Sequence, residues 1–301
     1  MKKTITTALC LLATLCLLAA PVRAAEPLET IESHYNSIFV FKEGTYVTLA
    51  FGHQSKRYVE SRRNTEDLLE LPVSYTRSLT AAVAYAEKLD TMLMIGMGGG
   101  STSWYLHKHI PEASVTAVEL DAEMIRLAQK YFKMTPQPNL RIEESDGRLF
   151  LARDKTAYDL IMVDAYRGPF VPFHLLTREF YQLAKARLAP GGVLAQNVEP
   201  STMLFDSTYA TLLEVFDQVD FIPASGNVVA IAYDGKRRAE LDLMRIARKR
   251  QKTFGLRYPL TRMIGARKRL DRPGDDVKPL TDDFAPVNIL KAIKVHNRKW
   301  Q

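Results

Sequence analysis

The sequence predicts an α/β fold in which a small N-terminal β domain precedes a seven-stranded, mostly parallel sheet. Short apolar runs alternate with helix-like segments between residues 91 and 233, as in sheets whose strands are buried on both faces. The last two runs, Val219–Ile222 and Val228–Tyr233, flank Ser225-Gly226-Asn227, which predicts an antiparallel edge hairpin. Acidic residues follow several runs, and this pattern indicates a polar edge where the strands end.

Residues 1–24 have the pattern of an export signal. Lys2 and Lys3 precede the apolar stretch Ile5–Ala20, which is too short for a membrane span, and Val22-Arg23-Ala24 offers a cleavage site. The alternative is an N-terminal anchor that stays uncleaved. We expect cleavage near Ala24 and export to the periplasm or the exterior of the cell.

Cleavage there would change the composition of the chain. Both cysteines, Cys10 and Cys16, lie in the segment, so the mature protein would have no disulfide, thiolate nucleophile or cysteine metal site. The formal net charge would fall from +7 to +4, because the segment carries three basic residues and no acid. We divide the remainder into residues 25–71, 72–235 and 236–301.

The small β domain is expected at residues 25–71. Ser37–Phe41 and Tyr46–Phe51 flank Lys42-Glu43-Gly44-Thr45, a hairpin signal, and Arg57–Val59 is a third short strand.

A helix is predicted to begin at Pro72, with Val73 and Leu79 on its buried face. Tyr75 lies on this helix shortly before the next strand. The sequence leaves two interpretations of Tyr75 open, a packing residue or a ligand contact.

The central motif is a βαβ unit from Thr91 to Asp121. An apolar strand leads into a glycine-rich turn, a helix is predicted at Ser101–His109, and a second strand ends near Glu119. Glycines let the turn approach a ligand closely, and an acid about 20 residues later can accept hydrogen bonds from ribose hydroxyls. The turn contains Gly96, Gly98, Gly99 and Gly100.

This arrangement predicts a nucleoside site, although a tight structural turn with a surface Glu would look the same. The dinucleotide fingerprint requires G-x-G-x-x-G; Gly96 and Gly98 fit it, but Ser101 occupies the third position. An adenosine ligand with a short sulfonium arm is therefore favoured over NAD.

The alternation continues to residue 233. Asp121 is expected to cap a helix reaching Phe132, and Thr177 to cap one that runs to Leu188. The remaining expected elements are strands at Leu140–Glu144, Tyr158–Val163 and Val193–Val198 and helices at 146–152 and 205–218.

Acidic residues follow three consecutive strands of this series. Glu119 and Asp121, then Asp146, then Asp164 would form one polar rim at the carboxyl edge. The alternative is helix capping, since Asp121 and Asp146 are both good N-caps.

These residues resemble the spermidine synthase family of aminopropyltransferases, in its divergent exported branch. The resemblance covers residues 37–233 and a tail motif at 280–287. It implies a Rossmann-like sheet of the class I S-adenosylmethionine methyltransferase type. The motifs that carry it are IGMGGGS, AVELDAEMIRLAQKYF, ESDGRLFL, YDLIMVDAY, VPFHLLTREFY and LAPGGVLAQNV.

The resemblance implies roles for individual residues. The glycine turn would face the sulfonium or thioether end of the nucleoside, Glu119 would hold the ribose, and Asp146 beside Gly147 would accept from the adenine amino group. Asp164 would orient and deprotonate the attacking amine, and Tyr75 would contact that amine.

Two positions depart from the family pattern. The turn has Gly99 where spermidine synthases have an aspartate, and Arg167 stands where a second aspartate covers the amine. Both changes disfavour a diamine cation.

His174, just before a predicted helix, is either a substrate contact or base or a loop-ordering residue. The histidines show no ligand spacing, and no metal site is expected.

The tail at 236–301 has 19 basic residues against 7 acids. We favour a solvated helix near Lys236–Lys252 that folds back onto the acidic domain, with a second basic cluster at Arg267-Lys268-Arg269. The alternatives are weak contact with an anionic surface such as lipid headgroups, or with an acidic partner; nucleic acid is not expected.

The expected function is transfer of an aminopropyl group to a small-molecule amine acceptor. The cofactor would be decarboxylated S-adenosylmethionine or S-adenosylmethionine. The alternatives are a methyltransferase and a non-catalytic binder of nucleosides or polyamines. The family resemblance also implies a homo-oligomer.

Overall fold

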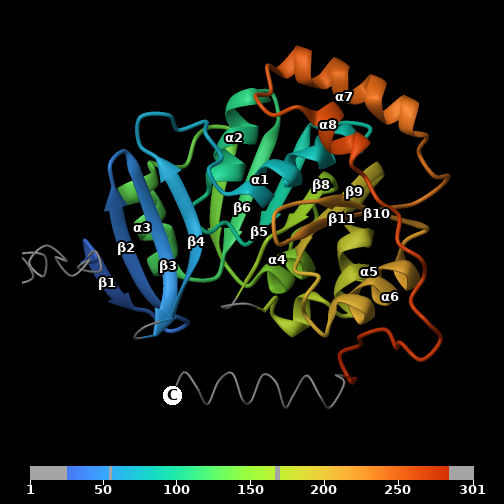
Figure 1. Ribbon diagram of the computed structural model, residues 1–301, viewed down its shortest axis with the longest axis horizontal. Coiled ribbons are helices and arrows are strands. Elements are labelled where there is room, and N and C mark those ends of the chain that lie inside the picture. The colour runs from blue at the N-terminus through green and yellow to red at the C-terminus, as the bar shows by residue number, and fades with distance from the viewer. Residues whose placement is uncertain (1–25, 54–55, 167–169, 285–301) are drawn as a thin grey trace, which may run out of the picture.

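The computed structural model describes residues 26–53, 56–166 and 170–284 (Figure 1). The expected signal segment, Arg167 and the end of the tail motif, residues 285–287, lie outside these ranges.

The N-terminal part forms a four-stranded antiparallel sheet in the order β1-β2-β3-β4. The predicted hairpin is present, with Gly44 in its turn at φ 57°. The expected third strand is longer than Arg57–Val59, and a further strand, β1, was not expected. The strands are β1 Glu29–Glu32, β2 Ser37–Glu43, β3 Tyr46–His53 and β4 Lys56–Asn64.

β1 pairs with the neighbouring strand β2, but it was missed because its sequence pattern is weak and its other partners are distant in sequence. Only Ile31 in this short strand is apolar, so its sequence lacks a strand-like pattern. Glu29 binds Arg126 and Lys130 on helix α3 (Ala122–Phe132) at 2.8 and 2.7 Å. The apolar face of the sheet, including Ile38 and Leu49, packs on the same helix.

The central sheet has seven strands in the order β10-β11-β9-β8-β5-β6-β7. The five strands from β9 to β7 are parallel, and β10 and β11 form the predicted antiparallel edge hairpin. The predicted fold class is confirmed. The strands are β5 Thr91–Ile95, β6 Ser114–Glu119, β7 Leu140–Glu144, β8 Tyr158–Val163, β9 Leu188–Val198, β10 Gln218–Pro223 and β11 Val228–Tyr233.

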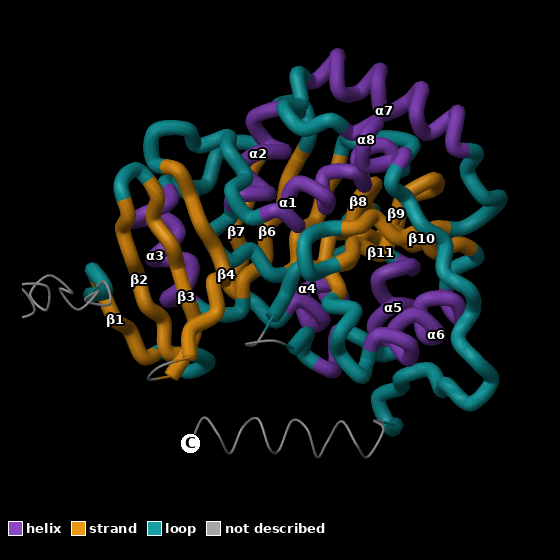
Figure 2. Tube along the Cα trace, in the orientation of Figure 1, coloured by secondary structure: helices purple, strands orange, loops and turns teal. Residues whose placement is uncertain are grey.

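Helices cover both faces of this sheet (Figure 2). One apolar core lies under α2, α7, α8 and a 3-10 turn, and the other lies under α4, α5 and α6. The helices are α1 Ser74–Leu79, α2 Ser101–His109, α4 Gly147–Arg153, α5 Arg178–Ala186, α6 Phe205–Val215, α7 Glu240–Phe254 and α8 Leu260–Gly265, with 3-10 turns η1 Thr80–Ala84 and η2 Phe173–Leu175.

Several helix boundaries differ from the sequence prediction. The first helix begins at Ser74 rather than Pro72, because Val73 is extended at ψ 122° and acts as the cap. The helices expected to reach Leu188 and Gln218 stop at Ala186 and Val215, because Leu188 and Gln218 already pair within strands.

The basic tail folds back onto the sheet's helical layer. Leu243 and Ala247 of α7 are fully buried against η1 and α8, while most of its basic side chains are exposed. Arg267 differs from the expected surface cluster, because it is nearly buried and binds Asp220 at 3.1 Å. Among the described residues, no helix has the length and apolar character needed to cross a membrane.

Candidate active site

The glycine turn connects β5 to α2 at the carboxyl edge of the central sheet. Gly96 has φ 84°, and a Cβ added there would lie 2.4 Å from the backbone oxygen of Asp164. Any side chain at this position would therefore collide with the end of β8. The glycine lets two neighbouring strand ends meet at one point.

Glu119 is the last residue of β6 and faces this turn. Its Oε2 accepts from the Gly98 amide at 2.8 Å, and its Oε1 accepts from Leu120 and Asp121 amides at 3.0 and 3.2 Å. Burial raises the pKa of Glu119, and these amide bonds oppose the rise. The predicted approach of Glu119 to the glycine turn is confirmed.

Asp164 directly follows β8. Its Oδ1 accepts from Asn197 Nδ2 at 2.9 Å, and its carboxylate is also hydrogen-bonded to Tyr75. Burial outweighs both bonds and raises its pKa to about 6. A carboxylate with this pKa is mostly ionised at neutral pH and still a better base than an ordinary aspartate.

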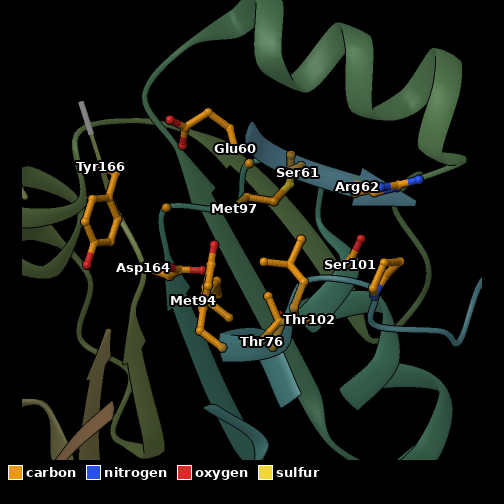
Figure 3. Close-up of a pocket in the computed structure, with 15 residues that line it drawn as sticks. Glu60, Ser61, Arg62, Thr76, Met94, Met97, Ser101, Thr102, Asp164 and Tyr166 are labelled. Atoms are coloured by element: carbon orange, nitrogen blue, oxygen red, sulfur yellow. The ribbon is translucent and has the colours of Figure 1, made fainter. Parts of the chain in front are cut away.

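A pocket that is partly open to solvent lies between the glycine turn and Asp164 (Figure 3). Of the predicted site residues, Asp164, Tyr75, Gly96 and Gly98 line it, together with residues from the N-terminal sheet and α2. The further lining residues are Glu60, Ser61, Arg62, Pro72, Val73, Thr76, Met94, Met97, Ser101, Thr102 and Tyr166.

Asp146 and His174 lie elsewhere along the same edge and do not line this pocket. Asp146 Oδ1 caps α4 by accepting from the Arg148 and Leu149 amides, both at 2.9 Å. Its Oδ2 lies 2.7 Å from His174 Nε2. The hydrogen bond to His174 is the largest cause of a lowered Asp146 pKa.

The predicted caps are confirmed at both Asp121 and Asp146. Asp121 Oδ1 accepts from the Glu123 amide at 3.0 Å, and its Oδ2 accepts from Ser33 Oγ at 2.5 Å. Of the four acids predicted to form a polar rim, Asp164 alone is among the residues lining the pocket.

Several neighbours of this site were not identified from the sequence, and four of them carry polar groups close to Asp164 or the glycine turn. Glu60 and Ser61 come from β4, Tyr166 follows Asp164, and Asn197 lies near the end of β9. Asn197 had a signal, since it sits in the quoted LAQNV motif at a strand end. Glu60 had none, because only packing of the N-terminal sheet brings β4 to the glycine turn.

The site is acidic. Glu60 and Asp164 line it, Glu119 lies behind the turn, and the carboxylates raise the pKa of Glu60 together with burial. This charge suits a sulfonium or ammonium ligand, and the amide-bound Glu119 fits a ribose. No group of three or more His, Cys, Asp or Glu side chains in the described ranges could hold a metal ion.

Comparison with known families shows that residues 73–224 match the spermine/spermidine synthase domain. A polyamine aminopropyltransferase from Vibrio vulnificus (strain CMCP6) is 29% identical over 298 residues, which span 93% of this chain and 97% of the relative. The human eEF1A lysine and N-terminal methyltransferase is 26% identical over 245 residues, 76% of this chain and 31% of that protein.

Among solved structures, a probable spermidine synthase from Corynebacterium glutamicum ATCC 13032 has a similar fold. Its TM-score is 0.65 at 19% identity, and the alignment covers 85% of this chain and 97% of that chain.

Proposed function

The chain belongs to the spermine/spermidine synthase domain family, and we propose that it transfers an aminopropyl group from decarboxylated S-adenosylmethionine to a small-molecule amine. The observation that carries the proposal is Asp164. Its partly buried carboxylate, with a pKa raised to about 6, lines a pocket that also includes Gly96 and Gly98 of the glycine turn.

In this proposal Glu119 and the glycine turn hold the nucleoside. Glu119 has two oxygens already oriented by backbone amides, and each oxygen can accept a further bond from a ribose hydroxyl. Asp146, beside Gly147, would accept from the adenine amino group while keeping its bonds to α4 and His174.

The bound sulfonium cofactor would supply an electrophilic carbon. Asp164 would orient the amine and take its proton as the new C–N bond forms and the C–S bond breaks, with the electron pair left on sulfur. Tyr75 donates to Asp164 and would contact the amine from the same side. Asn197 would hold the Asp164 carboxylate in place.

His174 would order the loop that ends at η2. Its contacts support this role, because its ring binds Asp146 and its carbonyl oxygen accepts from Arg148 Nη1 at 3.3 Å. Arg148 in turn binds Asp282 of the tail with both nitrogens, at 2.7 and 2.5 Å.

A methyltransferase is the second candidate, and two observations favour it. The glycine turn lacks the family aspartate at Gly99, and a human methyltransferase is among the relatives of this chain. S-adenosylmethionine would then be the cofactor.

A thermal-shift screen of the purified protein tests the proposal. Decarboxylated S-adenosylmethionine, S-adenosylmethionine and methylthioadenosine are compared at about 100 times their dissociation constants, where a ligand adds roughly 2.7 kcal/mol. Preference for the decarboxylated form, with turnover on di- and polyamines, supports aminopropyl transfer. Preference for the carboxylate form supports methyl transfer, and no shift with any ligand contradicts both.

We also propose that the protein acts after export and cleavage near Ala24, as a homo-oligomer whose basic tail makes at most weak anionic contacts. Mass spectrometry of the mature N-terminus and analytical ultracentrifugation test these statements. An N-terminus at Met1 or a monomer at all concentrations would contradict them.

A further inference from the structure

Glu60 reaches the pocket from the N-terminal sheet. It lies on β4 next to Ser61, whose Oγ accepts from the Gly99 amide at 2.9 Å. Arg63, two residues further along, is fully buried and donates to Ser101 Oγ at 3.4 Å. These contacts hold β4 along the glycine turn and set Glu60 in the same pocket as Asp164 (Figure 3).

The Glu60 carboxylate has no hydrogen-bond or ion-pair partner in the part of the chain that the structure describes. Burial raises its pKa well above the ordinary value, and the charges of Asp164 and Glu119 add to the rise. An unpaired carboxylate in a pocket that also holds a second carboxylate is unfavourable without a ligand, and a bound cation would favour both charges.

The two arginines that follow Glu60 on β4, Arg62 and Arg63, make their contacts with other residues, although some of their nitrogens have no hydrogen-bond partner. Arg62 also lines the pocket, but it binds Glu43 Oε2 at 3.4 Å and its guanidinium lies 4.5 Å from the centre of the Tyr46 ring. Arg63 packs over Trp104, 5.8 Å from the ring centre, and is not among the lining residues. Among the residues that the structure describes, no cationic side chain pairs with Glu60 or Asp164.

The glycine turn has no space for a carboxylate of its own. A Cβ at Gly99 would lie 2.2 Å from Phe132 Cε2 and 2.9 Å from Ser61 Cβ. Phe132 is fully buried in the core under the N-terminal sheet, so it cannot move aside at low cost. An acidic group at this end of the pocket must come from another element, and β4 supplies one.

From these contacts we infer that Glu60 binds a primary ammonium group of the substrate, opposite Asp164, and so replaces the acidic side chain that the glycine turn cannot carry. This inference rests on the proposed function. The ammonium belongs either to the aminopropyl group of the sulfonium donor or to the amine acceptor. The test below measures binding of each ligand separately and so distinguishes the two.

The test compares Glu60→Gln with wild type and with Glu66→Gln, the same change at an exposed position just after β4. Calorimetry measures binding of decarboxylated S-adenosylmethionine in one arm. The other arm measures binding of putrescine to protein that is saturated with methylthioadenosine. Binding of methylthioadenosine by itself is the neutral reference, because this nucleoside has no ammonium group. The amide keeps the size of the side chain, and it removes an unpaired buried charge, so the variant should be at least as stable as wild type.

We expect Glu60→Gln to weaken one of the two cationic ligands at least about tenfold, because a charge-assisted bond is lost. Methylthioadenosine affinity should stay within about twofold, and Glu66→Gln should change nothing. Weaker binding of decarboxylated S-adenosylmethionine would show that Glu60 binds the ammonium of the aminopropyl group. Weaker binding of putrescine would show that Glu60 binds the ammonium of the amine acceptor.

An equal loss for methylthioadenosine would overturn the inference, because Glu60 would then only shape the pocket. Unchanged affinity for both cations would overturn it as well. If wild type binds no methylthioadenosine, the proposed function itself fails; if wild type binds all three ligands, only the inference about Glu60 is at stake.

Discussion

The ends of β7 and β8 carry the same residue type in opposite environments. Two residues after β7 ends, Asp146 uses both carboxylate oxygens, one to cap α4 and one to bind His174, and its pKa is lowered. Directly after β8, Asp164 has Asn197 and Tyr75 as partners but loses so much solvent that its pKa rises to about 6. The first environment stabilises a charge, and the second destabilises one.

This difference separates a binding and structural role from a catalytic one. A carboxylate whose charge is well satisfied has little tendency to take a proton, while one that is poorly satisfied is a stronger base at neutral pH. Substitutions at Asp164 and at Asp146 test this difference.

The largest expected effect is on turnover. Asp164→Asn should lower kcat by 10²- to 10⁴-fold, the range of a general base, because the amide cannot accept the amine proton. Asp146→Asn keeps the cap and should lower kcat by less than about tenfold. Initial rates at saturating donor and amine measure both, and similar losses in the two variants would break the comparison.

The pH dependence of the wild-type enzyme gives a second test of the difference between Asp164 and Asp146. Because the Asp164 pKa is raised to about 6, kcat/KM should fall about tenfold per pH unit below that value as the base becomes protonated. Asp146, with a lowered pKa, should contribute no acid limb in this range. A profile that stays flat down to pH 4 would argue against Asp164 as the base.

Stability should change in opposite directions for the two aspartates. The folded pKa of Asp164 is about 2 units above its unfolded value, so Asp164→Asn should raise the free energy of unfolding at pH 7, by at most about 3 kcal/mol. This gain should disappear as the pH falls below about 4, where the carboxyl is protonated in both states.

Asp146→Ala should instead lower the free energy of unfolding by about 1–2 kcal/mol, through the lost cap and the lost bond to His174. The carboxylate's contribution is present above its unfolded pKa near 4 and is lost as the pH falls through the lower folded value. Urea denaturation at pH 7 and pH 4 measures both variants. The same sign for Asp164→Asn and Asp146→Ala at pH 7 would contradict the contrast.

The smallest expected effect is at His174. His174→Gln keeps a donor near Asp146, so kcat should change less than about tenfold and the unfolding free energy should fall by roughly 1 kcal/mol or less. A loss of 10²-fold or more, with unchanged stability, would show that His174 takes part in proton transfer.

Much of the central sheet and its helices was predictable because the signals are local. The strand Tyr158–Val163, the helix Ser101–His109 and the caps at Asp121 and Asp146 follow from apolar runs, turn glycines and capping side chains within a few residues. The approach of Glu119 to the glycine turn also followed, since parallel strand order brings successive carboxyl ends together.

Other parts of the site depend on contacts between segments far apart in the chain. The bond from Asn197 to Asp164 spans 33 residues, and His174 reaches Asp146 across 28. The position of Glu60 depends on β4 packing along the turn, and nothing in the local pattern of β4 marks that residue.

By itself, then, the sequence determined the sheet, the glycine turn and the acids at the strand ends, because periodicity and turn geometry act over short distances. Only the tertiary structure decided that Asp146 is paired with His174 and that Asp164 is shielded from solvent. Burial and partner distance set the pKa of a carboxylate, and both are properties of the packed chain rather than of any segment of it.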